Sequence, residues 1–119
     1  MANIGASIES MSYLAGSVLQ IAKQILSLRH GGKPKGIASR RIGSQSLVEV
    51  IWEGRNHAMH WEETVPHKKV KEMFDLLASD FGMDVEYGKN NCLSLLGVLS
   101  WSSADQVIQD LHELTSEKA

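Results

Sequence analysis

The sequence predicts an all-α fold, a bundle of four to five helices in a single domain that spans residues 1–119. Three observations predict this class. A length of 119 residues with 43% hydrophobic content suits one domain around one core. Apolar residues recur at three- and four-residue steps in several segments, which is the helical period. Residues 83–87 alternate like a strand, but one strand alone has no partner to pair with.

Residues 4–29 form the longest periodic segment and predict one amphipathic helix that ends before Gly31-Gly32. Its serines and Gly16 make it a weak helix in isolation, so packing against a core must stabilise it. A second possibility is that part of this helix faces another subunit. The repeating apolar positions are Ile4, Ile8, Met11, Leu14, Ala15, Val18, Leu19, Ala22, Ile25 and Leu26.

Residues 31–45 are rich in glycine, serine and basic residues, and this composition predicts a loop. A second helix is predicted over residues 47–62. Ser44 or Ser46 can cap its start, because a serine oxygen accepts a hydrogen bond from an unpaired backbone N–H. Gly54 costs this helix about 1 kcal/mol relative to alanine.

A third helix is predicted over residues 65–81, with Thr64 as its cap and Pro66 in its first turn. The proline also ends the second helix by about residue 64. Gly82 is a fitting C-terminal stop, because glycine adopts the left-handed conformation without strain. The apolar residues 92–99 then predict a short buried helix.

The last helix is predicted to follow a capping box made by Ser103 and Gln106. In such a box each of the two side chains bonds the backbone N–H of the other residue. The residues expected to face the core from this helix are Val107, Ile108, Leu111 and Leu114.

The second predicted helix carries most of the side chains capable of chemistry. At roughly 100° per residue its polar residues share one side and its apolar residues spread over the other. Arg55 falls inside the apolar arc. Such an arginine extends its stem along the core with its charge toward solvent, pairs with a buried glutamate, or lies at a seam where an anion or a second chain docks. The polar side holds Glu49, Glu53, Asn56, His57 and His60.

The run Arg55-Asn56-His57-Ala58-Met59-His60 resembles the Arg-x4-His signature of the HEPN superfamily. These small all-helical domains occur in toxin ribonucleases, abortive-infection proteins and RNA-guided CRISPR ribonucleases. The Arg-Asn form with a four-residue gap is a frequent variant, and it lies on a helix, as predicted here. The resemblance covers this motif and the helical layout around it. It implies a HEPN-like bundle and a metal-independent endoribonuclease of the toxin or defence type, without a cofactor.

The residue types of the motif suit cleavage of RNA without a metal. An imidazole has an ordinary pKa of about 6.5, so a histidine such as His60 suits acid–base catalysis at neutral pH. The planar cation of Arg55 matches phosphate oxygens, and Asn56 orients the histidine or holds a phosphate. Arg55 and His60 lie roughly 140° apart around a straight helix, so they converge poorly in one copy. In the resembling family two motifs meet across a dimer, which implies a homodimer here.

The predicted loop is unusually basic for a chain of net charge −2. The segment between Ser10 and Val48 holds half of the 12 lysines and arginines and none of the 14 acids. A flexible, acid-free basic loop is suited to gripping a nucleic-acid backbone. The alternative is a solvated loop without a specific partner. The candidate RNA-binding residues are Lys33, Lys35, Arg40 and Arg41.

Two other functions remain open at this point. One is a non-catalytic helical module that binds RNA or a protein, in which Arg55 and His60 are structural. The other is a metal-binding helical bundle, because helices build metal sites from histidines and carboxylates one turn apart. The metal ligands would be Glu53, His57 and His60, with a further ligand from His30, His67 or His112.

The sequence also bears on location and partners. The chain has no apolar run long enough to span a membrane. It lacks a secretory signal, and its single Cys92 allows no internal disulfide, so we expect a cytoplasmic protein. Some toxins of the resembling family carry a tyrosine two residues after the motif histidine, which an antitoxin modifies. That position is Glu62 here, so the expected antitoxin partner acts by another route.

Overall fold

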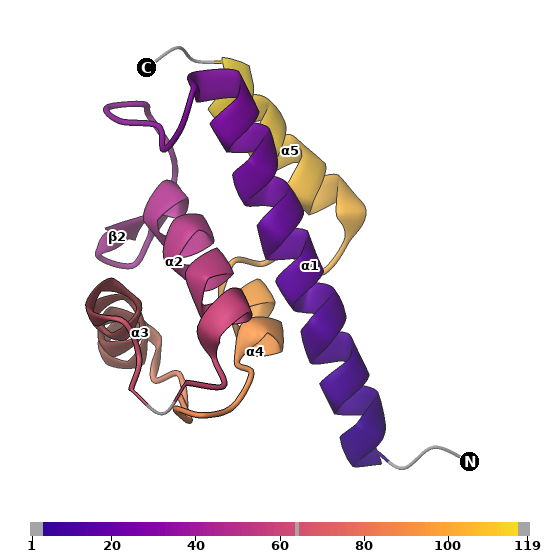
Figure 1. Cartoon of the computed structure of the whole chain (residues 1–119). Helices are drawn as coiled ribbons and strands as arrows, with labels where there is room; N and C mark the ends of the chain where they lie inside the picture. Colours follow the sequence, from indigo (N-terminus) through magenta and orange to yellow (C-terminus); the bar gives the residue numbers. More distant parts are fainter. Residues whose placement is uncertain (1–3, 64, 117–119) are drawn as a thin grey trace.

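In the computed structural model the helix α2 lies at the centre of the molecule, with α1 on one side and α3 on the other (Figure 1). The structure describes residues 4–63 and 65–116. These residues form five helices and one short hairpin, which confirms the all-α prediction. The elements are α1 (Ile4–His30), β1 (Arg41–Ile42), β2 (Gln45–Ser46), α2 (Leu47–His60), α3 (Lys68–Phe81), α4 (Cys92–Val98) and α5 (Ala104–Ser116).

The helix α1 matches its predicted bounds, but its apolar residues divide into two stripes. Ala15, Leu19, Ala22 and Leu26 are buried, and this face packs on α2, α4 and α5. The other stripe stays exposed along most of the helix. It consists of Ile8, Met11, Leu14, Ile21, Ile25 and Leu28.

The predicted loop contains the hairpin of β1 and β2, in which Arg41 pairs with Ser46 and Ile42 with Gln45. Ser46 is the residue that caps α2, because its Oγ accepts a hydrogen bond from the backbone N–H of Glu49 at 3.2 Å. Of the two serines expected to be caps, Ser46 is therefore confirmed.

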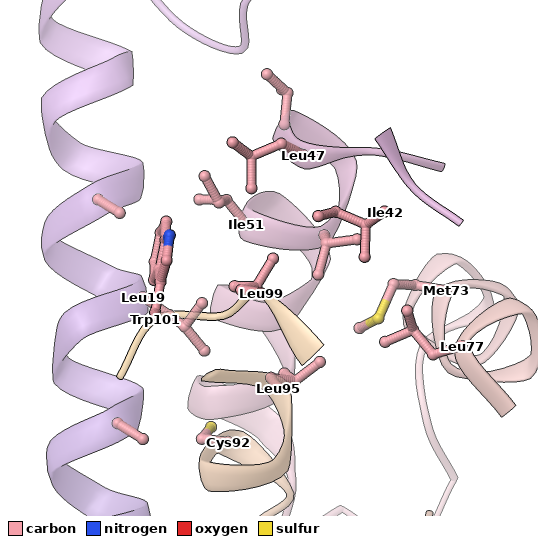
Figure 2. Close-up of a cluster of buried hydrophobic side chains, with 14 of the residues drawn as sticks. Leu19, Ile42, Leu47, Ile51, Met73, Leu77, Cys92, Leu95, Leu99 and Trp101 are labelled. Carbon is pink, nitrogen blue, oxygen red and sulfur yellow. The ribbon is translucent and has the colours of Figure 1, made fainter. Parts of the chain in front are cut away.

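The glycine of α2 allows three helices to approach one another closely. A Cβ atom on Gly54 would lie 3.2 Å from Cδ1 of Leu95 on α4 and 3.4 Å from Cδ1 of Leu19 on α1. The conformational cost of this glycine is therefore offset by packing. Figure 2 shows part of the buried cluster around this contact, with labelled side chains from α1, the hairpin, α2, α3 and α4, and the cluster also includes Leu111 and Leu114 of α5.

The helix α3 begins three residues later than predicted, at Lys68. Its N-cap residue is His67, which has an extended backbone and makes no side-chain capping bond. The predicted cap Thr64 lies outside the described residues. Gly82 ends the helix in the left-handed conformation, with its N–H bonded to the carbonyl of Ala78, which confirms the predicted stop.

The short helix α4 is buried as predicted, through Cys92 and Leu95. At the start of α5 one half of the capping box forms, because Oε1 of Gln106 accepts from the N–H of Ser103 at 3.2 Å. The expectation that Ile108 faces the core is wrong, since 62% of this residue is exposed. The reason is that α5 lies at the edge of the bundle and packs chiefly on α1.

No helix in the described ranges combines the length and apolar character that a bilayer span requires.

Candidate functional site

The motif arginine links α2 to α1. Its Nε donates a hydrogen bond to Oε1 of Gln20 on α1 at 2.6 Å, and its Nη1 donates to Oδ1 of Asn56 at 3.2 Å. Nδ2 of Asn56 in turn donates to Oε1 of Glu53 at 3.0 Å. Within the described residues Arg55 has no acidic partner of its own. The half-buried cation is thus held by two neutral amides, and Asn56 separates it from the buried carboxylate of Glu53.

The motif histidine lies at the exposed end of α2, where its side chain is 44% accessible. Nδ1 of His60 lies 3.2 Å from Oε2 of Glu63, and Nε2 of His67 lies 3.2 Å from the same oxygen. The two imidazole rings are 4.6 Å apart between centroids. Sequence reasoning missed this cluster, although the spacing of three and then four residues was a visible signal.

The polar side of α2 is buried in its middle, whereas Glu49 and His60 toward its two ends stay accessible. His57 is only 5% exposed and Glu53 only 4%. Nε2 of His57 accepts the backbone N–H of Asn91 at 2.9 Å, and the ring packs edge-on against Phe74 of α3 at 4.8 Å. Burial lowers the pKa of His57 to about 4, so the ring is neutral at pH 7, with its proton on Nδ1.

The predicted metal ligands Glu53, His57 and His60 do not come together. The lone pair on Nε2 of His57 is already used by the N–H of Asn91. Among the described residues, the group whose ligand atoms lie close together is His60, Glu63 and His67.

A shallow hollow opens beside the exposed end of α2. Its walls include Asn56, His57 and His60 from the helix, His67 from the start of α3, and Tyr87 from the segment before α4. Two of the three predicted catalytic residues, Asn56 and His60, therefore face one hollow. Arg55 does not line this hollow, but it is hydrogen-bonded to Asn56, which does.

Two of the four predicted RNA-binding residues are committed to contacts within the fold. Lys33 pairs with Glu49 at 2.8 Å between Nζ and Oε1. Arg40 grips the carboxylate of Asp110, with Nε 3.0 Å from Oδ1 and Nη2 2.8 Å from Oδ2. Lys35 and Arg41 remain exposed, although Arg41 donates a local hydrogen bond to the carbonyl of Ser44.

Asp110 is the centre of a polar network that joins the basic loop to α5. Besides Arg40, it accepts the indole Nε1–H of Trp101 at 2.6 Å. Nη2 of Arg40 also donates to the carbonyl of Leu99. Burial by itself raises the pKa of Asp110, but the hydrogen bonds from Arg40 and Trp101 and the charge of Arg40 outweigh it, so the pKa lies below its ordinary value.

The basic loop and the motif lie at opposite ends of α2. Lys33 contacts Glu49 in the first turn of the helix, whereas His60 is its last residue. At 1.5 Å per residue Glu49 and His60 are about 16 Å apart along the axis. A ligand that touches both must therefore be extended.

The single cysteine is not a nucleophile. Cys92 is fully buried among apolar residues, and this burial raises the pKa of its thiol to about 12.

Fold and site together define a five-helix all-α domain with a polar cluster at the exposed end of its central helix. A comparison of the chain with protein-family models, curated proteins and solved structures finds no significant match. The HEPN resemblance therefore stays a prediction that rests on the motif of α2.

Proposed function

We propose that this chain is a HEPN-like endoribonuclease that acts as a dimer and without a metal ion, in a toxin or defence setting. Arg55, Asn56 and His60 are its active-site residues. One observation carries the proposal. The ring of His60 stays exposed beside a hollow that Asn56 also lines, while Asn56 holds a guanidinium that has no acidic partner within the described residues.

The proposed reaction uses the 2′-hydroxyl of RNA as the nucleophile. His60 of one copy accepts the hydroxyl proton, the 2′-oxygen attacks phosphorus, and the bond to the 5′-oxygen breaks. A protonated His60 from the second copy gives its proton to the leaving oxygen. Arg55 stabilises the charge that builds on the phosphate oxygens. The products are a 2′,3′-cyclic phosphate and a free 5′-hydroxyl, so the step consumes no water.

The exposed stripe of α1 supports the proposed dimer. Met11 and Ile25 lie two heptads apart, and Leu14, Ile21 and Leu28 repeat every seven residues, which is the narrow seam typical of paired helices. Val18, the heptad position between Met11 and Ile25, packs partly against the core. The residues that flank the seam, Ser10, Ser17 and Gln24, are uncharged. A neutral, apolar seam matches a second copy of itself. Tyr13 packs edge-on against Trp61 at 6.4 Å, which places the N-terminal half of the stripe at the motif end of the molecule.

The Leu14→Glu, Ile21→Glu double variant is expected to convert the dimer to a monomer. Both residues are more than half exposed, so the monomer tolerates the change, whereas the dimer would bury unpaired charges. We expect the dimer dissociation constant to rise at least about a hundredfold. Sedimentation velocity measures it. The control Leu76→Glu places a charge on exposed apolar surface of α3, away from α1, and should keep the dimer. Equal effects of the two changes would contradict pairing through α1.

In this proposal the extended RNA strand reaches the basic loop. Lys35 and Arg41 carry the exposed charges there, while Lys33 and Arg40 already hold Glu49 and Asp110. Contacts to phosphates release counterions, so binding should weaken steeply with salt.

RNA cleavage in the presence of a chelator tests the proposed activity. The purified protein is incubated with RNA and EDTA, and His60→Ala is expected to lower the cleavage rate about 100- to 10,000-fold, the usual contribution of acid–base catalysis. Arg55→Ala should cause a comparable loss because the phosphate charge is no longer stabilised. Circular dichroism verifies that each variant is folded.

Gln20→Ala is the matched control for the arginine. It removes the same bond between α1 and α2 but leaves the guanidinium in place. Activity retained in Gln20→Ala and lost in Arg55→Ala supports a catalytic cation. Equal losses in both variants would assign Arg55 to helix packing, and unchanged cleavage in His60→Ala would favour a non-catalytic RNA- or protein-binding module.

A further inference from the structure

His60, Glu63 and His67 form a compact group where α2 ends and α3 begins. The two imidazole nitrogens lie 3.2 Å from one carboxylate oxygen, Oε2 of Glu63. All three side chains reach the surface, and all three border the hollow beside α2. We propose that these residues bind one divalent transition-metal ion such as Zn²⁺.

The distances fit a tetrahedral ion. Zinc binds imidazole nitrogen at about 2.0–2.1 Å and carboxylate oxygen at about 2.0–2.2 Å, so adjacent ligand atoms in a tetrahedral site lie about 3.3 Å apart. Both nitrogen–oxygen distances, 3.2 Å, are close to this spacing. All the ligand atoms lie within 4.8 Å of one another, so a small side-chain rotation brings the two imidazole nitrogens to the tetrahedral spacing. The exposure of both histidines permits that rotation.

The backbone already places these ligands. The N–H of Glu63 bonds the carbonyl of His60 at 3.0 Å, which holds the carboxylate beside the end of α2. His67 is the N-cap residue of α3 but makes no side-chain capping bond, so its ring remains available as a ligand. The group therefore needs little reorganisation to bind an ion.

The ligand types select the class of ion. Two imidazoles and one carboxylate suit zinc, nickel, copper or cobalt, whereas magnesium and calcium prefer oxygen ligands. Three protein ligands leave a fourth position open toward the hollow. The histidines must be neutral to bind, so protons compete with the ion and affinity should fall as the pH is lowered.

Metal binding also has a consequence that rests on the proposed function. Nδ1 of His60 is the ligand atom in this geometry, and the same imidazole is the proposed acid–base group. A ring fixed to an ion no longer exchanges its proton with RNA. Zinc is therefore expected to inhibit cleavage, and chelation to restore it.

Zinc binding is measured directly by competition of the full chain with a chromophoric chelator at pH 7.5. We expect one ion per chain, with affinity lowered more than about tenfold in Glu63→Gln and in His67→Asn, since losing a ligand should cost at least as much as losing a supporting residue. The controls Glu62→Gln and His112→Asn change an exposed carboxylate and an exposed imidazole outside the group and should bind as the wild type does.

Two outcomes overturn the inference: no zinc bound at micromolar concentration, or equal binding by the wild type, Glu63→Gln and His67→Asn. The two assays also separate a failure of the metal site from a failure of the proposed ribonuclease function. Zinc bound through these residues by a chain that cleaves no RNA keeps the metal site and rejects the enzyme. His60-dependent cleavage of RNA in the presence of chelator, by a chain that binds no zinc, keeps the enzyme and rejects the metal site.

Discussion

Acidification from pH 7 to pH 4 is expected to remove up to about 3 kcal/mol of folding free energy through His57 alone. Its pKa is about 4 in the folded protein because the ring is buried, whereas the unfolded chain has the ordinary value of about 6.5. Between these two values the unfolded state binds a proton that the folded state rejects. Stability contributed by the neutral ring is therefore complete above pH 6.5 and is lost as the pH falls toward 4.

The comparison of wild type with His57→Gln isolates this contribution. Glutamine keeps an acceptor for the N–H of Asn91 but does not titrate. Urea unfolding at several pH values from 7 to 4 should show the wild type losing about 3 kcal/mol more than the variant across this range. NMR should show that the ring of His57 titrates near pH 4.

The variant His112→Gln serves as the control, because this histidine is exposed on α5. Its unfolding free energy should follow that of the wild type at every pH. A difference between wild type and His57→Gln that stays constant from pH 7 to pH 4 would show that the buried ring does not govern acid stability.

Removing the carboxylate at the centre of the polar network is expected to destabilise the fold by about 2 to 3 kcal/mol. Asp110→Ala leaves the guanidinium of Arg40 without its counter-charge and the indole N–H of Trp101 without an acceptor. Breaking a fully buried ion pair costs about 3–5 kcal/mol. The loss expected here is at or below the low end of this range because the side chain of Arg40 is 37% exposed, so water partly screens its charge.

Urea unfolding at pH 7 measures this loss. Asp75→Ala is the matched control, because it removes an exposed ion pair with Lys71 on α3 and should cost clearly less than Asp110→Ala. Similar losses in the two variants would show that the network around Asp110 is no stronger than a surface pair. The same reasoning affects RNA-binding assays, because replacing Arg40 perturbs the fold as well as the charge of the loop.

The helices of this protein could be predicted because their signals are local. The apolar period of α1, the serine that caps α2 and the glycine that ends α3 each act within a few residues. The start of α3 was predicted too early because proline is compatible both with a first helical turn and with the extended segment that precedes one. His67, the residue directly before the helix, has the extended backbone of the second alternative.

The candidate site was only partly predictable. Arg55, Asn56 and His60 are recognisable as a motif because they lie on consecutive turns of one helix. The bond from Arg55 to Gln20 and the grip of Arg40 on Asp110 join residues 35 and 70 positions apart. No local pattern reports such contacts, since they depend on how the helices are placed against one another.

The sequence by itself determined that this chain is helical, where its helices begin and end to within a few residues, and which side chains share a face of α2. Only the tertiary structure decided which of those faces is covered. A helical period orders residues around an axis but does not say how many neighbours the helix has. Because α2 lies between α1 and α3, the middle of its polar side is buried too, which makes His57 a neutral packing residue and leaves His60 as the exposed histidine of the motif.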